Sequence, residues 1–108
     1  RGLARGLRSD EAVVRAATRI GRGSRLTDED LETVLLAAWM HDLGYASIGQ
    51  KGHEEQSAVE AREFLREKGI PEARIQLVEG CILATRVPQL PQNRLEEVMC
   101  DADMYHLA

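Results

Sequence analysis

The segment "LLAAWMHDLGYAS", residues 35–47, places His41 and Asp42 side by side at the end of an apolar run. On a helix, both side chains continue the apolar face, because each follows core-type residues by three and four positions. A buried carboxylate needs a cation, hydrogen-bond donors or a metal ion to offset its desolvation. Two interpretations follow: the pair binds a metal ion, or Asp42 accepts backbone N–H groups of the "LGYAS" turn beside a core histidine.

A second acidic segment, "DADMYH", belongs to the predicted final helix. At about 100° per residue, Asp103 lies at the edge of the apolar stripe of that helix, whereas Asp101 lies well away from it. His106 also points inward, either as a core side chain or as a further site residue. Inward carboxylates and a histidine from separate helices form a mixed O and N set. Such a set suits a divalent ion such as Mn²⁺, Mg²⁺, Fe²⁺, Ni²⁺ or Zn²⁺.

Helices must position these residues, since apolar residues recur with helical spacing along most of the chain. Five helices are predicted, at about residues 9–21, 27–42, 53–68, 71–86 and 93–108. No stretch shows the alternation of a strand, apart from an ambiguous piece near residues 81–87. The predicted fold class is therefore all-α, with a bundle of about five helices.

Short sequence signals mark the predicted helix ends. Ser9 is a predicted N-cap, Thr27 with Asp30 resembles a capping box, and Asn93 with Glu96 forms a second cap-like pair. The segment "LGYASIGQKG" is predicted to be a loop, and the two prolines of "VPQLPQ" forbid continuation of a helix. The second helix is predicted to be central and buried, with a face of Leu31, Val34, Leu35, Ala38 and Trp39 that Leu36, Ala37 and Met40 widen.

The composition is that of a soluble globular protein, with 44% hydrophobic and 30% charged residues in a chain of 108. No apolar run approaches the roughly 18 residues of a membrane helix, so we expect a cytoplasmic protein without a membrane partner. Cys81 and Cys100 form no CxxC pair and are predicted to be buried, reduced thiols. The chain begins with Arg, and we expect residues 1–108 to be a single domain, incomplete at one or both ends.

Positive charge is concentrated near the start of the chain. Residues 1–25 carry seven Arg against Asp10 and Glu11, within a chain of net charge −4. A basic segment of this kind could contact nucleic acid or anionic lipid. Arg15, Arg19 and Arg22 recur at helical spacing, which favours a solvated helix face and disfavours nucleic acid as a partner.

Four segments occur in an order and approximate spacing similar to those of small bacterial HD-domain proteins: "AAWMHDLGY", "GHEEQSAVEAREFL", "ILATRVPQLPQ" and "EEVMCDADMYHLA". Together they resemble the HD superfamily of metal-dependent phosphohydrolases over roughly residues 27–108. The resemblance implies an HD-domain-like helical bundle and a divalent metal ion held by His41, Asp42 and Asp103. In this interpretation, Asp42 or Asp103 also orients the water that attacks phosphorus.

Further residues acquire roles through the same resemblance. His53, in "GHEEQSA", would ligate a second ion or act as the general acid for the leaving group. From its position alone, His53 is equally a solvated residue at the start of a helix. Lys51 and Arg86 are candidates for phosphate binding, and are otherwise surface side chains. Two-metal members have a later histidine where this chain has Thr85 and Arg86, which favours one metal ion.

The family pattern also includes a histidine on the first core helix, whereas no histidine precedes His41 here. Arg5, Arg8 or Ser9 occupies the region where it would fall. Three explanations stay open: the ligand lies upstream of this chain, the alignment is shifted around a gap, or the site is degenerate. The loss of one protein ligand would weaken metal affinity.

The predicted function is metal-dependent hydrolysis of a nucleotide or another small phosphoester. The alternative is a degenerate HD domain that binds a nucleotide or a partner protein as a regulatory module without catalysis. A homodimer is compatible with both.

Overall fold

The structure, a computed structural model, describes the backbone of residues 2–107 and the side chains of residues 11–105. Six helices and no strand are found in this part of the chain: α1 (Gly2–Gly23), α2 (Asp28–Met40), α3 (Leu43–Ile48), α4 (His53–Glu67), α5 (Glu72–Leu83) and α6 (Arg94–Leu107). The predicted all-α class is confirmed. No described helix has the length and apolar character needed to cross a membrane.

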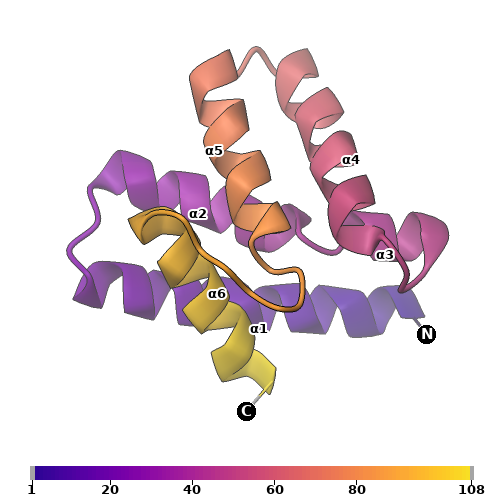
Figure 1. The fold of residues 1–108 in the computed structure, drawn as a ribbon, viewed down its shortest axis with the longest axis horizontal. Coiled ribbons are helices and arrows are strands. Elements are labelled where there is room, and N and C mark those ends of the chain that lie inside the picture. The colour runs from indigo at the N-terminus through magenta and orange to yellow at the C-terminus, as the bar shows by residue number, and fades with distance from the viewer. Residues whose placement is uncertain (1, 108) are drawn as a thin grey trace.

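The helices are arranged around α2. Figure 1 shows α1 and α2 lying along each other, while α4 and α5 form a hairpin on one side and α6 crosses in front of α1. Helix α6 packs against α1, α2 and α5, and α2 also packs against α5. This packing brings Asp103, on the last helix, to the end of α2 that carries His41 and Asp42.

The five longer helices share one hydrophobic core. Its fully buried side chains include Val13, Val34, Leu65, Ile75, Val78, Ile82 and Met99. Burial of such aliphatic side chains is the main force that holds helices of this length together, because short helices are marginal on their own in water.

Two of the three predicted helix caps are confirmed. The Thr27 hydroxyl accepts from the backbone N–H of Asp30 at 3.1 Å, and Asn93 Oδ1 accepts from the backbone N–H of Glu96 at 2.9 Å. The predicted N-cap at Ser9 is wrong, because α1 begins at Gly2 and continues through Ser9. The preceding residues include Leu, Ala and Arg, which are good helix formers, so the helix extends toward the N-terminus.

Three other expectations require correction. Residues 43–48, predicted to be part of a loop, form the short helix α3. Helix α5 ends at Leu83, so Arg86 lies in the following turn. Trp39, placed on the buried face of α2, is 44% exposed. The buried face of α2 centres on Ala37 and Ala38, and Trp39 lies roughly 200° around the helix from Ala37.

The cysteines are buried and free, as the sequence predicts. Burial is the main cause that raises the pKa of Cys81 to about 12 and that of Cys100 to about 11. The Cys100 thiol donates to the carbonyl oxygen of Ala84, 3.2 Å away, which ties α6 to the end of α5.

Candidate metal centre

His41 caps the C-terminal end of α2, and its ring is buried, with the residue 5% exposed. Its Nδ1 lies 2.7 Å from the carbonyl oxygen of Ala38. A carbonyl oxygen only accepts, so Nδ1 carries the hydrogen and donates. In the neutral imidazole this leaves the lone pair on Nε2, the atom that faces the acidic residues.

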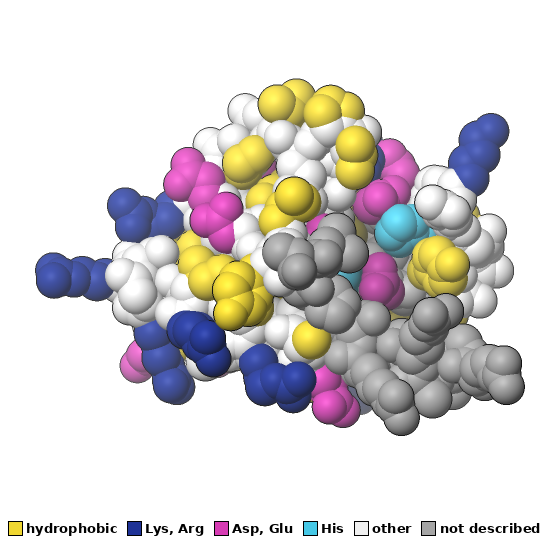
Figure 2. Space-filling view, turned by 90° about the horizontal axis from the view of Figure 1, so that it is seen from below, with side chains coloured by type: hydrophobic (Ala, Val, Ile, Leu, Met, Phe, Trp, Pro, Cys, Tyr) yellow, Lys and Arg dark blue, Asp and Glu magenta, His cyan; other side chains and the backbone are white. Residues whose placement is uncertain are grey.

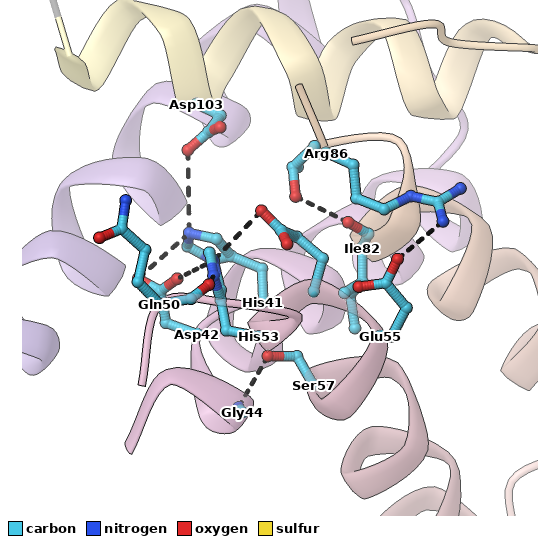
Figure 3. A network of polar contacts seen from close by, with 12 residues as sticks. His41, Asp42, Gly44, Gln50, His53, Glu55, Ser57, Ile82, Arg86 and Asp103 are labelled. Atoms are coloured by element: carbon cyan, nitrogen blue, oxygen red, sulfur yellow. Dashed lines mark hydrogen bonds and ion pairs between the residues drawn. The ribbon is translucent and has the colours of Figure 1, made fainter. Parts of the chain in front are cut away.

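Two carboxylates from different parts of the chain face His41 Nε2. Asp42 Oδ2 lies 3.5 Å from this nitrogen and Asp103 Oδ1 lies 3.8 Å from it. Figure 3 shows the two carboxylates on the side of the His41 ring that carries Nε2. The Asp103 side chain is 17% exposed, whereas Asp101, two residues earlier, is exposed. The helical wheel therefore predicted correctly which of the two aspartates faces inward.

The alternative interpretation is wrong for Asp42, which does not accept the backbone N–H groups of the "LGYAS" turn, whereas its expectation of a buried, hydrogen-bonded histidine is met by His41. Asp42 occupies the N-cap position of α3, but its side chain makes no capping hydrogen bond. Its two carboxylate oxygens instead face two imidazoles: Oδ2 faces His41, and Oδ1 lies 3.7 Å from His53 Nε2. Asp42 thus lies between the end of α2 and the start of α4.

His53 is oriented in the same manner as His41. Its Nδ1 donates to the carbonyl oxygen of Gln50 at 2.8 Å, which leaves Nε2 facing Asp42 and Glu54. Glu54 Oε2 lies 3.4 Å from Nε2. The Tyr45 ring meets the His53 ring edge-on, with 5.6 Å between centroids. Figure 2 shows histidine and acidic side chains side by side on one face of the molecule.

The donor chemistry of this cluster fits a divalent cation. A nitrogen lone pair and carboxylate oxygens repel one another unless a proton or a cation lies between them. Ligands at about 2.0–2.2 Å from one ion are separated by roughly 3 Å, slightly less than the N–O separations around His41. Among the described side chains, no group of three or more His, Cys, Asp or Glu residues forms a metal-binding group as it stands. The separations of Asp42 and Asp103 from His41 Nε2 would each have to shorten by less than about 1 Å to reach this ligand spacing.

The two predicted phosphate-binding residues lie at the surface. Arg86 Nη1 lies 2.8 Å from Glu55 Oε2, and the hydrogen bond with Arg86 is the main cause that lowers the pKa of Glu55. Lys51 is exposed in the turn before α4, near the start of the helix that carries His53. The side chains of His106, Arg5, Arg8 and Ser9, which the sequence raises as neighbours of the metal centre, lie outside the described residues.

Several residues of the site were not singled out from the sequence. Glu54 is one of them, and its position directly after His53 at the start of a predicted helix was a usable signal. Ser57 is fully buried, and its hydroxyl accepts from the backbone N–H of Gly44. Gln89 donates to Asp103 from the segment that joins α5 to α6. No periodic pattern in the sequence points to either contact.

The family model of the HD domain matches residues 10–108. The chain belongs to the HD domain family. HD domains are generally metal-dependent phosphohydrolases that bind divalent metal ions. The all-helical fold and the His41–Asp42 doublet at the end of α2 agree with this membership. No curated protein and no solved structure matches the chain.

Proposed function

We propose that this HD domain is a metal-dependent phosphohydrolase that acts on a nucleotide or another small phosphoester. The main support is the position of His41 Nε2, which faces the carboxylates of Asp42 and Asp103 at 3.5 and 3.8 Å. The three side chains come from two distant segments and meet at a mostly buried point. A buried set of one imidazole and two carboxylates suits a divalent ion.

In this proposal, His41, Asp42 and Asp103 hold the ion. When bound, a divalent ion polarises a phosphoryl oxygen and activates water for attack on phosphorus. The hydrogen bond from His41 Nδ1 to Ala38 keeps Nε2 directed at the site. Asp42 Oδ2 faces His41 and Oδ1 faces His53. If Oδ2 contacts the ion, Oδ1 remains able to orient water toward the substrate.

His53 is the proposed general acid. Its Nδ1 is held by the Gln50 carbonyl oxygen, so a proton for the leaving oxygen would be carried on Nε2, next to Asp42. Lys51 and Arg86 are the proposed contacts to substrate phosphate. Arg86 is about half exposed and would exchange its ion pair with Glu55 for a phosphoryl group.

A second candidate function is a degenerate HD domain that binds a nucleotide or a protein without catalysis. It is favoured by one observation: the described side chains form no complete metal-binding group. Lys51 and Arg86 could still bind the phosphates of a nucleotide in such a domain, without hydrolysis.

The two functions are separated by a hydrolysis screen. Nucleoside mono-, di- and triphosphates and p-nitrophenyl phosphate are incubated with the domain and either Mn²⁺ or a chelator. The proposal predicts release of phosphate with Mn²⁺ and none with the chelator. It also predicts that Asp42→Asn lowers the rate of phosphate release by at least about 100-fold. Asp101→Asn is the matched control and should keep the wild-type rate, because Asp101 is exposed. Turnover that persists in Asp42→Asn would contradict the proposal, and nucleotide binding without any turnover would support the degenerate domain.

A further inference from the structure

Gln89 lies in the segment that joins α5 to α6, and its side chain reaches back to the candidate metal centre. Its Nε2 lies 3.1 Å from Asp103 Oδ2 and 3.4 Å from the carbonyl oxygen of Thr85. An ionised carboxylate and a carbonyl oxygen can only accept, so the amide group of Gln89 is the donor at both contacts. Gln89 is half-buried, and its amide therefore joins the end of α5 to the inward face of α6.

The contact divides the two oxygens of Asp103 between different partners. Oδ1 faces His41 Nε2, and Oδ2 accepts from Gln89. Rotation of the carboxylate about its Cβ–Cγ bond would break the hydrogen bond with Gln89. The amide thus holds one oxygen of Asp103 in the direction of His41.

We propose that Gln89 is a positioning residue for the metal centre, which orients Asp103 for one-oxygen coordination of the ion. This inference rests on the proposed function, because it requires Asp103 to be a ligand. Hydrogen bonds to a ligating carboxylate fix its orientation, and removal of such an outer partner typically costs about 10–100-fold in metal affinity.

The role in positioning can be separated from a role in folding, because other contacts also hold this segment. The backbone N–H of Gln92 donates to Glu96 Oε1 at 2.9 Å, and the Thr85 hydroxyl donates to the carbonyl oxygen of Ile82 at 2.7 Å. Neither contact involves the Gln89 amide. Loss of that amide should therefore change the direction of the Asp103 carboxylate more than the path of the chain.

The same segment offers a matched control in Gln92. Its side chain is exposed, and its Nε2 donates to the carbonyl oxygen of Leu90 at 3.0 Å, so the local chemistry is similar without a contact to Asp103. Gln89→Met and Gln92→Met both replace the amide by a side chain of similar length without a donor. Gln89→Ala is a second variant, in case the methionine packs differently.

The experiment measures Mn²⁺ affinity from the electron paramagnetic resonance signal of free Mn²⁺, with thermal unfolding of the metal-free domain in parallel. We expect Gln89→Met and Gln89→Ala to raise the Kd for Mn²⁺ by about 10–100-fold, with Tm close to that of Gln92→Met. Gln92→Met should leave the Kd within about twofold of the wild type. Wild-type binding of Mn²⁺ with no loss in either Gln89 variant would overturn this inference alone. A wild-type domain that binds no Mn²⁺ would overturn the proposed function, and this inference with it.

Discussion

The backbone N–H of Gly44 donates to the buried hydroxyl of Ser57, with 2.7 Å between nitrogen and oxygen. This contact joins the first turn of α3, just after Asp42, to the turn of α4 that follows His53. Gly44 also lies against the α4 backbone: a Cβ at this position would stand 2.3 Å from the carbonyl oxygen of His53 and 2.6 Å from the Ser57 nitrogen. The close approach of the two helices therefore sets the spacing between Asp42 and His53.

Gly44→Ala should destabilise the domain, because backbone atoms of α4 cannot yield to the added methyl group. Overpacking of this kind costs about 1–3 kcal/mol, and more where the obstacle is backbone. Chemical denaturation measures the loss. Gly23→Ala is the control, since a Cβ there meets nothing within 4 Å and alanine favours the helix. Equal stability of the two variants would show that α3 does not pack against α4 in this way.

The helix caps illustrate what local sequence determines. Thr27 and Asn93 were predicted correctly, because an N-cap depends on a side chain and a backbone N–H within a single turn. The prediction for Ser9 was wrong, because a serine marks the start of a helix only where the residues before it are not helical. Helix α3 was missed because Gly44 indicates a loop by composition, whereas here it permits close packing between helices.

The candidate metal centre was only partly predictable for a similar reason. Helical periodicity indicated that Asp103 faces inward and Asp101 outward, and the burial of the two residues agrees. The hydrogen bond between Gln89 and Asp103 joins a non-helical segment to a helix, so no spacing rule predicts it. The roles of Lys51 and Arg86 in substrate binding stay predictions, because the structure holds no substrate that would test them.

Arg62 links α4 to α5 through two carboxylates. Its Nε lies 2.8 Å from Glu79 Oε2 and its Nη1 lies 2.9 Å from Glu72 Oε1, with a further close contact to Glu79. We expect Arg62→Met to lower Tm more than Arg66→Met, because Arg66 is more exposed and lies 3.7 Å from Glu72. Thermal unfolding at low salt and at about 1 M NaCl tests this, since salt screens the exposed pair of Arg62 with Glu72 and, to a smaller extent, the partly buried pair with Glu79. A difference in Tm that does not shrink at high salt would contradict the electrostatic explanation.

The same pairing predicts a pH dependence. The hydrogen bond from Arg62 is the main cause that holds the pKa of Glu72 below its ordinary value of 4.5. A carboxylate with a lowered pKa in the folded state stabilises the fold above its ordinary pKa, and this stabilisation is lost as the pH falls through the lowered value. Below pH 4.5, the wild type should therefore lose more stability than Arg62→Met. An equal loss of stability with falling pH in the wild type and in Arg62→Met would contradict this prediction.

The cysteines should be inert in the folded domain. The thiolate is the reactive form, and burial raises the pKa of Cys81 to about 12 and that of Cys100 to about 11. We expect no reaction with a thiol-specific chromogenic reagent at about pH 8 under native conditions, and reaction of both thiols in denaturant. Fast reaction of either thiol in the native protein would show that the contact between α5 and α6 opens readily.

A cation shared by His41, Asp42 and Asp103 would be seen directly in a crystal structure of the domain grown with Mn²⁺. Anomalous scattering locates the ion without reference to the protein geometry. We expect an anomalous peak within about 2.0–2.4 Å of His41 Nε2 and of one oxygen each from Asp42 and Asp103. Anomalous density elsewhere, or a peak that does not contact Asp103, would show that these three residues do not share a metal ion.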